Sequence, residues 1–415
     1  MATSTAPLAG LLRASLTLAA GGAVAQALPL LLGPLLTRLF TPAEFGLYHL
    51  FAAVAANVAV VACARYEFAL PLAADEGEAD ALRRLSLRLL AGTTGLSALG
   101  AAAWVIAGAG DWAAWLPLAV ATAGAASLAT LWATRLQRFR ALAAARVLQY
   151  GGAALAQAAA GWAGAGVTGL IVAPIAAAGL ATALLRLPLV GAHGTARPLT
   201  LREVAKRHRA FPLLNTPHAF AGALQDTLSL ALIAAALGPA AAGFWGLALR
   251  YLKAPATLVG SAVSQALYPK LAEAGATPEA RRALRRVMGL LALLAAPLVV
   301  ALWVGGPRAF AFFFGPDWRE AGLLARALAL YIGMHFVASP LAVVTMAWQA
   351  QGWALGISLA GQVAFVLALA TGLHWGGLVG AGWLVSIAMA AYFGYYFWRL
   401  ATWPVSTPVE QSASR

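Results

Sequence analysis

The chain alternates between long apolar stretches and short polar turns. A helix of 20 apolar residues is about 30 Å long, which matches the hydrocarbon core of a membrane. The pattern therefore predicts a membrane protein built from spanning helices. Twelve apolar stretches are recognised, at residues 14–36, 45–64, 86–108, 113–134, 147–165, 168–190, 211–237, 241–268, 287–306, 321–347, 354–373 and 378–399.

The first two stretches form a hairpin with a recognisable helix start. Pro42 suits the first turn of a helix, and Thr41 can cap the free amides before it. Residues 45–64 then carry no charged side chain. Arg65 and Glu67 follow at the far end of this span, where we expect lipid headgroups.

A weaker copy of this helix start lies in the second half of the chain. Residues 238–245 repeat the pattern of residues 41–48, with a glycine and an aromatic residue at matching distances after the proline. Internal repeats are common in secondary transporters, whose substrate path lies between the two halves. We therefore predict an all-α protein with two six-helix lobes, residues 1–196 and 211–415. The basic linker, residues 197–210, would either lie on anionic lipid or simply join the lobes and fix the topology.

Composition and charge support a membrane protein with a defined orientation. The chain has 415 residues, of which 62% are hydrophobic and 10% charged, whereas charged residues make up about 25% of soluble proteins. The net charge is +14. The basic residues are spread over turns between spans and do not form one patch with interleaved aromatic residues, so we expect no nucleic-acid partner. Most of them lie in turns on the side of the N-terminus, which predicts that both termini are cytoplasmic.

Several short motifs have a simpler interpretation than their pattern suggests. Residues 25–27 resemble a signal-peptidase site, but the apolar run continues to Leu36, so we expect an uncleaved first helix. The G-x-G-x-x-G match at residues 164–169 joins two predicted spans and no acid follows it, so it is interpreted as a loop. Cys63 is the only cysteine, and no Cys/His metal spacing exists. No metal, cofactor or direct use of ATP is expected.

Arg250 and Lys253 are the most informative charged residues. If their span begins near Ala242, they lie about 12 and 17 Å into the membrane on one helix face. A cation facing lipid at the bilayer centre costs about 2.5–3.5 kcal/mol, so both should face protein, water or an anionic ligand. The alternative is a helix that begins near Ala254 and leaves both residues in a loop.

Other polar residues fall at comparable depths in the two halves. Asp226 and Gln225 lie in the middle of the seventh span, and the repeat places them close to the level of Gln26 in the first. Asp226 would either carry a coupling proton or cation, or neutralise Arg250 or Lys253. Gln26, Gln225 and Asn215 are candidate hydrogen-bond partners for a sugar.

The order of motifs resembles one family of membrane proteins over nearly the whole chain. It is similar to the O-antigen and polysaccharide flippases, the Wzx-like proteins of the multidrug/oligosaccharidyl-lipid/polysaccharide exporter superfamily. The motifs that carry the resemblance are Leu36-Thr37-Arg38-Leu39-Phe40-Thr41-Pro42, Phe45-Gly46-Leu47-Tyr48, Arg65-Tyr66-Glu67, Leu70-Pro71, Asp75-Glu76-Gly77-Glu78, Arg146-Val147-Leu148-Gln149, Gly238-Pro239, Phe314-Gly315-Pro316-Asp317-Trp318-Arg319-Glu320-Ala321-Gly322 and Ser339-Pro340-Leu341.

The resemblance implies a transporter, not an enzyme. Its cargo would be a polyprenyl-diphosphate-linked oligosaccharide, moved from the cytoplasmic to the outer leaflet of the bacterial inner membrane. Cationic residues in a central cavity would hold the diphosphate, with Arg38, Arg65, Arg250 and Lys253 as candidates. Membrane lipids, a polysaccharide polymerase and a chain-length regulator are the implied partners. A cation-coupled small-molecule exporter and a membrane glycosyltransferase or polymerase remain as alternatives.

Overall fold

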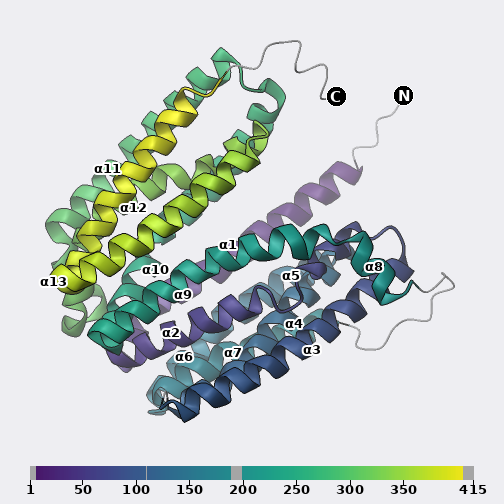
Figure 1. The fold of residues 1–415 in the computed structure, drawn as a ribbon, viewed down its shortest axis with the longest axis horizontal. Coiled ribbons are helices and arrows are strands. Elements are labelled where there is room, and N and C mark those ends of the chain that lie inside the picture. Colours follow the sequence, from purple (N-terminus) through teal and green to yellow (C-terminus); the bar gives the residue numbers. More distant parts are fainter. Residues whose placement is uncertain (1–5, 109, 188–198, 405–415) are drawn as a thin grey trace. The chain divides into compact units, whose positions relative to one another are not determined.

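The fold is helical wherever the structure describes it. The computed structural model describes residues 6–108, 110–187 and 199–404, and side-chain exposure from residue 21 onward. This part of the chain contains long helices and no β-strand (Figure 1). The linker residues 197–198 and the last residues of the chain lie outside the described part.

Each predicted span coincides with a helix or a run of helical turns. The helices up to residue 237 are α1 (Ala6–Leu39), α2 (Pro42–Ala59), η1 (Tyr66–Leu72), α3 (Glu76–Ile106), η2 (Asp111–Trp115), α4 (Leu116–Arg135), α5 (Phe139–Arg146), η3 (Val147–Gly152), α6 (Ala153–Trp162), α7 (Gly166–Leu185), α8 (Leu201–Arg207), η4 (Phe211–Asn215) and α9 (Thr216–Leu237). The later helices are α10 (Pro239–Ala274), α11 (Pro278–Phe314), η5 (Pro316–Trp318), α12 (Arg319–Ala347) and α13 (Gln351–Ala401).

In the described part, 8 helical segments are long and apolar enough to cross a membrane. One of these segments is α13, with 51 residues, which combines the last two predicted spans. Gly376 and Gly377 interrupt its helical backbone between them. The predicted multi-span, all-helical membrane fold is confirmed.

The helix start at Thr41 has the predicted capping geometry. The Glu44 amide donates to Thr41 Oγ1 over 3.3 Å, and the Thr41 amide donates to Glu44 Oε2 over 2.8 Å. This reciprocal pair satisfies amides that the first turn of a helix leaves free. The corresponding start of α10 uses Gly238 with a φ of 85°, a left-handed backbone that favours glycine.

Two predicted boundaries are wrong. Helix α2 ends at Ala59 and not at residue 64, and residues 60–65 form a turn. Residues 307–320, which separate the predicted spans 287–306 and 321–347, are largely helix, because α11 continues through Pro307 to Phe314. Phe314 is 5% exposed there, so burial of the last turn of α11 outweighs the tendency of the proline to end a helix.

Contacts divide the chain into two compact units, residues 1–227 and 228–415. The division falls within α9, whose first part is hydrogen-bonded to α2 through Thr227 Oγ1 and the Ala53 carbonyl at 3.0 Å. The predicted lobe boundaries stay predictions. Each unit is described separately below as unit 1 and unit 2.

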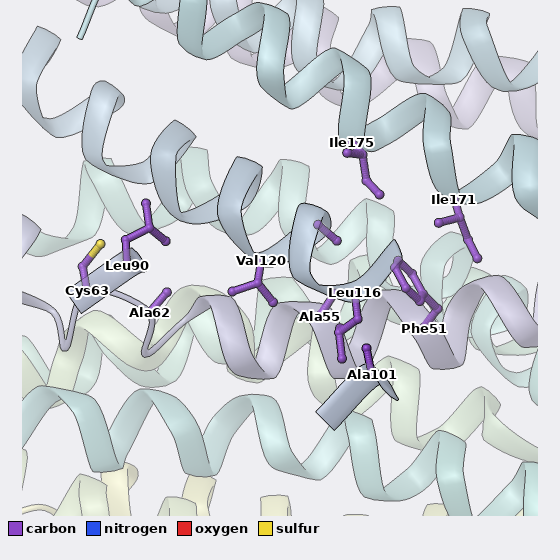
Figure 2. Packing of buried hydrophobic residues seen from close by; sticks show 11 residues of the cluster. Phe51, Ala55, Ala62, Cys63, Leu90, Ala101, Leu116, Val120, Ile171 and Ile175 are labelled. Atoms are coloured by element: carbon purple, nitrogen blue, oxygen red, sulfur yellow. The ribbon is translucent and has the colours of Figure 1, made fainter. Parts of the chain in front are cut away.

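The core of unit 1 lies where α2, α3, α4 and α7 meet. Figure 2 shows one cluster of buried side chains there, with Phe51 from α2, Leu90 from α3 and Ile171 from α7. Cys63 is part of this cluster and is 2% exposed, so the chain's one thiol is a packing residue.

Unit 2 is held together by close contacts between long antiparallel helices. Gly322 of α12 lies so near α11 that a Cβ atom there would be 2.6 Å from the Gly306 carbonyl oxygen. Ser386 Oγ of α13 donates to the Ala327 carbonyl of α12 over 2.6 Å, and both groups are buried. Small residues and interhelical hydrogen bonds are the usual means of joining helices in a membrane.

Candidate functional site

Lys253 lies inside α10 and not in a loop. The helix begins at Pro239, so both Arg250 and Lys253 belong to it and the alternative of a helix start near Ala254 is wrong. Both side chains are half-buried. Helix α10 is not one of the eight described segments that are long and apolar enough to cross a membrane.

An aromatic side chain of α12 lies beneath the Lys253 ammonium group. Its Nζ is 5.9 Å from the centre of the Tyr331 ring, and Tyr331 is 4% exposed. The face of an aromatic ring attracts a cation at this distance. This contact stabilises the charged form of the ammonium group.

Tyr331 belongs to a group of packed aromatic rings from α12 and α13. The ring centre of Tyr331 is 5.9 Å from that of His335, 5.8 Å from Phe365 and 6.3 Å from Phe393. The Phe365 and Phe393 rings hold Tyr331 in place by packing. Unit 2 therefore places the Lys253 cation beside a packed, buried group of aromatic rings.

Arg250 is three residues before Lys253, so both side chains lie on neighbouring turns of one face of α10. The adjacent Tyr251 ring packs against Phe314 of α11, with ring centres 4.6 Å apart. This contact fixes the rotation of α10 near Arg250. The structure thus brings two of the four predicted cationic residues together.

The other two predicted cations lie in unit 1, at opposite ends of α2. Arg38 lies in the last turn of α1 and is exposed, and its Nη1 donates to the Pro34 carbonyl over 2.9 Å. Arg65 follows the other end of α2, a helix of 18 residues and hence about 27 Å long. The structure does not bring Arg38 and Arg65 together.

Arg65 lies in a turn with an unusual backbone. Ala64 and Arg65 have φ values of 48° and 62°, in the left-handed region that non-glycine residues rarely adopt. The Arg65 guanidinium lies 4.3 Å from the centre of the Phe68 ring, which is 39% exposed. Arg65 itself is half-buried, so the turn holds this cation partly covered beside the ring.

The predicted polar candidates are spread out. Gln26, Asn215 and Asp226 are exposed, and Gln225 is half-buried. Asp226 lies at the end of unit 1, so its pairing with Arg250 or Lys253 stays a prediction. No described contact gathers these four residues into one site.

Two buried acids were not singled out as candidates from the sequence. Glu78, near the start of α3, accepts hydrogen bonds from the Ala74 amide at 2.7 Å and from Arg207 at 2.8 Å, and its Oε1 is 3.1 Å from His208 Nε2. Burial opposes its ionisation, but these hydrogen bonds outweigh burial and lower its pKa to about 2. Glu78 thereby ties α8 and the residue after it to α3.

Glu67, in the 3-10 helix η1, is just as buried, with 3% of its surface exposed. Its own amide and the charge of Arg65 favour the carboxylate, but burial is the larger effect and raises its pKa. Glu67 was visible in the sequence as part of the motif Arg65-Tyr66-Glu67, which carries the family resemblance. Its burial could not be foreseen, because it depends on how α3 and α4 pack over η1.

Comparison with known proteins relates the chain to membrane transporters. Residues 35–322 match the family model described as "Polysaccharide biosynthesis protein". No curated protein sequence matched the chain. Among solved structures, the lipid II flippase MurJ in an inward closed conformation superimposes with a TM-score of 0.72 and 11% identity, covering 93% of this chain and 88% of that one.

An inward-facing multidrug resistance MATE family transporter of the MOP superfamily gives a TM-score of 0.60 and 16% identity, covering 92% of this chain and 94% of that one. At these identities the similarity establishes the fold. The chain is a multi-pass membrane protein with the fold shared by MurJ and the MATE transporters. Because the family model covers most of the chain, the protein belongs to the family of polysaccharide biosynthesis proteins.

Proposed function

We propose that this protein flips a polyprenyl-diphosphate-linked oligosaccharide across the bacterial inner membrane by alternating access. The oligosaccharide would be a repeat unit of an O-antigen, a capsule or an exopolysaccharide. It would move from the cytoplasmic to the outer leaflet. Membership of the polysaccharide biosynthesis family and the fold shared with a lipid II flippase support this substrate class.

The chemistry of the cargo defines what the protein has to provide. The sugar and the diphosphate cannot cross hydrocarbon unaided, because polar and charged groups lose their hydration there. The polyprenyl chain can stay in lipid throughout. A flippase therefore needs a route that binds an anion and offers hydrogen bonds, and it needs no catalytic group.

The observation that carries this proposal is the position of Lys253 over Tyr331. The Lys253 side chain is half-buried, and its ammonium group lies over a ring face that favours a cation there. With Arg250 one turn away, α10 presents two cations that suit the two phosphates of the lipid carrier. Arg38 and Arg65, at the two ends of α2, would bind the diphosphate near the two membrane surfaces.

Other parts of the proposal follow from position alone. Gln26, Gln225 and Asn215 are proposed sugar contacts, and Asp226 a site of ion coupling or charge pairing. Both termini are proposed to be cytoplasmic, from the distribution of basic residues. A polysaccharide polymerase and a chain-length regulator are proposed partners, because they act on the product at the outer surface.

A cation-coupled small-molecule exporter is the second candidate, favoured by the fold shared with MATE transporters. Such a protein needs an acidic residue along its path to bind the coupling ion. Asp226 is the mid-span acid that meets this need, and it is exposed at the end of unit 1. Replacing Asp226 with Asn should abolish export in this case and have a smaller effect on a flippase that depends on Arg250 and Lys253.

The test is transport by purified protein in liposomes. A fluorescent polyprenyl-diphosphate sugar would be flipped by the wild type, and Lys253→Ala and Arg250→Ala should each lower the rate at least tenfold. Lys270→Ala is the matched control, because Lys270 lies on the same helix and is exposed. Wild-type rates in both α10 variants would remove the two cations from the site. Absence of flipping by the wild type, together with export of small cations, would favour the second candidate.

A further inference from the structure

Three arginine side chains gather where helix α13 ends. Arg285 of α11 donates from Nε and Nη2 to the Ala401 carbonyl over 3.0 and 2.6 Å. One turn earlier on α11, Arg281 Nη1 donates to the Trp403 carbonyl over 3.2 Å. Arg399 lies in the last turn of α13, with its guanidinium 4.9 Å from the centre of the Trp403 ring. We call Arg281, Arg285 and Arg399 the arginine cluster.

The end of α13 explains part of this arrangement. The last four carbonyls of a helix have no partner within it, and basic side chains can bind them. The aligned peptide dipoles also place about half a negative charge at this end. The arginine cluster carries three full positive charges, so the helix end neutralises a small part of them.

Carboxylates do not supply the rest. In the part of the chain that the structure describes, no ion pair joins the arginine cluster to an acidic side chain. The nearby Glu279 pairs with Arg282 instead, at 2.5 Å. Arg281 and Arg285 are four residues apart on one helix, where like charges repel. The Nε atom of Arg281 is moreover buried among the described residues without a hydrogen-bond partner. The cluster therefore has surplus positive charge and an unused donor.

Trp403, which contacts two of the three arginines, is held by packing. Its ring centre is 5.3 Å from that of Trp353 and 6.3 Å from that of Trp348. Trp353 in turn stacks on Tyr396, with ring centres 5.7 Å apart. Tyr396 is 8% exposed, so this group of rings is anchored in unit 2. The arginine cluster is thus built on a packed part of the fold.

The side chains next to the arginine cluster are those expected at a membrane surface. On α13, Tyr395 and Trp398 are 46% and 60% exposed, and these residue types are enriched where a membrane meets water. On α11, the side chains of Leu290, Leu293 and Leu294 are 61–69% exposed, as lipid-facing side chains are. Exposed leucines, exposed rings and arginines follow one another toward this end of unit 2. The acyl chains, interface and headgroup of a phospholipid have the same order.

We propose that the arginine cluster binds the phosphate group of an anionic phospholipid of the surrounding membrane. Guanidinium groups present several N–H donors to phosphate oxygens, and hydrogen bonds between two charged groups are strong. Basic pockets between membrane-spanning helices are suited to such headgroups. The lipid would bridge α11 and the end of α13 and so stabilise unit 2. It is a bound component of the membrane and not the cargo, so the site does not depend on the proposed function.

Binding is tested with phosphatidylglycerol as the probe. Native mass spectrometry of purified full-length protein in neutral detergent would count bound lipids as the lipid concentration is raised. Phosphatidylcholine is the comparison, because it carries the same phosphate with a compensating cation. A basic residue near an anionic surface changes affinity about fivefold. Arg399→Gln should therefore bind phosphatidylglycerol about fivefold more weakly at its tightest site.

Arg282→Gln is the matched control for this change. It removes one arginine from the same end of unit 2, but Arg282 is 66% exposed and paired with Glu279. Its affinity for phosphatidylglycerol should stay within about twofold of wild type. Equal binding of phosphatidylglycerol by wild type and Arg399→Gln would overturn the site. Equal binding of the two lipids by wild type would overturn it as well.

Thermal unfolding gives a second measurement and separates a lipid from a free anion. A ligand raises the midpoint by binding the folded state. Phosphatidylglycerol should raise the wild-type midpoint by several degrees more than phosphatidylcholine does, and this difference should shrink in Arg399→Gln. Inorganic phosphate alone should not reproduce it. An equal rise with inorganic phosphate would show a site for small anions and overturn the assignment to lipid.

The variants must be folded for these comparisons. Arg399→Gln leaves the carbonyl contacts of Arg281 and Arg285 in place, so it should keep the wild-type elution volume and its midpoint in phosphatidylcholine. Arg399→Lys is a second variant that retains the charge beside Trp403. It should keep most of the stabilisation by phosphatidylglycerol. Equal loss in Arg399→Lys and Arg399→Gln would show that charge does not hold the lipid and would overturn the proposal.

Discussion

Lys253 on α10 and Tyr331 on α12 form a cation–π pair, with 5.9 Å between the ammonium nitrogen and the ring centre. The Tyr331 ring packs against Phe365 and Phe393, which hold it in place beside the ammonium group. Preorganisation of this kind reduces the cost of binding. The pair is therefore suited to hold an anion.

The ring face, and not the hydroxyl group, should matter at Tyr331. Tyr331→Phe keeps the face and should flip a fluorescent polyprenyl-diphosphate sugar at close to the wild-type rate. Tyr331→Leu removes the ring face. A cation–π contact contributes about 0.5–2 kcal/mol. We expect a two- to thirtyfold lower affinity for the substrate in this variant. Equal loss in both variants would show that the hydroxyl group is required instead.

The two halves of α13 pack against each other through Gly372. A Cβ atom there would lie 2.4 Å from the Ala381 Cα atom, so Gly372→Ala forces backbone to move. Overpacking of this kind costs about 1–3 kcal/mol. The thermal midpoint of purified protein in detergent should fall by several degrees.

Gly376 provides the matched control for this change. It lies in the same helix break, and a Cβ atom there meets no atom within 4 Å. Its φ of −145° is also open to any residue. Gly376→Ala should leave the midpoint within about a degree of wild type, and a comparable drop in both variants would contradict the packing argument.

The sequence was sufficient to locate the cations but not their partners. Lys253 and Arg250 interrupt an apolar stretch, so their place inside a helix follows from the pattern. Tyr331 could not be paired with Lys253 in this way. Both α10 and α12 are apolar over most of their surface, so the pattern does not fix which face of one helix meets the other.

Helix ends were predicted less well than helix positions. Residues 307–320 contain proline and glycine, which usually favour a turn, yet α11 runs to Phe314. Burial of Phe310 and Phe314 decides the outcome, and that burial depends on residues far along the chain. The same holds for Glu67, which becomes a buried acid only when α3 and α4 cover it.

The stability of the protein should require arginine, and not merely a positive charge, at position 135. Its Nη1 donates to the Ala73 and Leu70 carbonyls, and its Nη2 to the Asp75 carbonyl at 3.2 Å. Lysine lacks this planar fork and cannot reach all three oxygens together. Arg135→Lys should lower stability by about 1–3 kcal/mol, measured as a lower thermal midpoint. Arg140→Lys, at an exposed arginine close by, should have no such effect.

Glu78 should control how firmly α8 is held on α3. Glu78→Gln keeps the shape but removes the charge that Arg207 and His208 contact. Amides of residues 201–207 should then exchange with deuterium at least tenfold faster at neutral pH. Glu76→Gln is the control, because Glu76 lies in the same turn with 70% of its side chain exposed, and exposed ion pairs contribute about 0–1 kcal/mol.

The same contact should depend on pH in a defined direction. The pKa of the Glu78 carboxyl group falls from 4.5 to about 2 in the folded protein. Its contribution to holding α8 is therefore fully present above pH 4.5 and is lost as the pH falls toward 2. Pepsin is active in this range and should at first cleave residues 199–210 more slowly in the wild type than in Glu78→Gln. As the pH is lowered, the wild-type rate should rise relative to the rate of the variant until the two are equal. Parallel rates for the two proteins across the whole range would show that Glu78 does not hold α8.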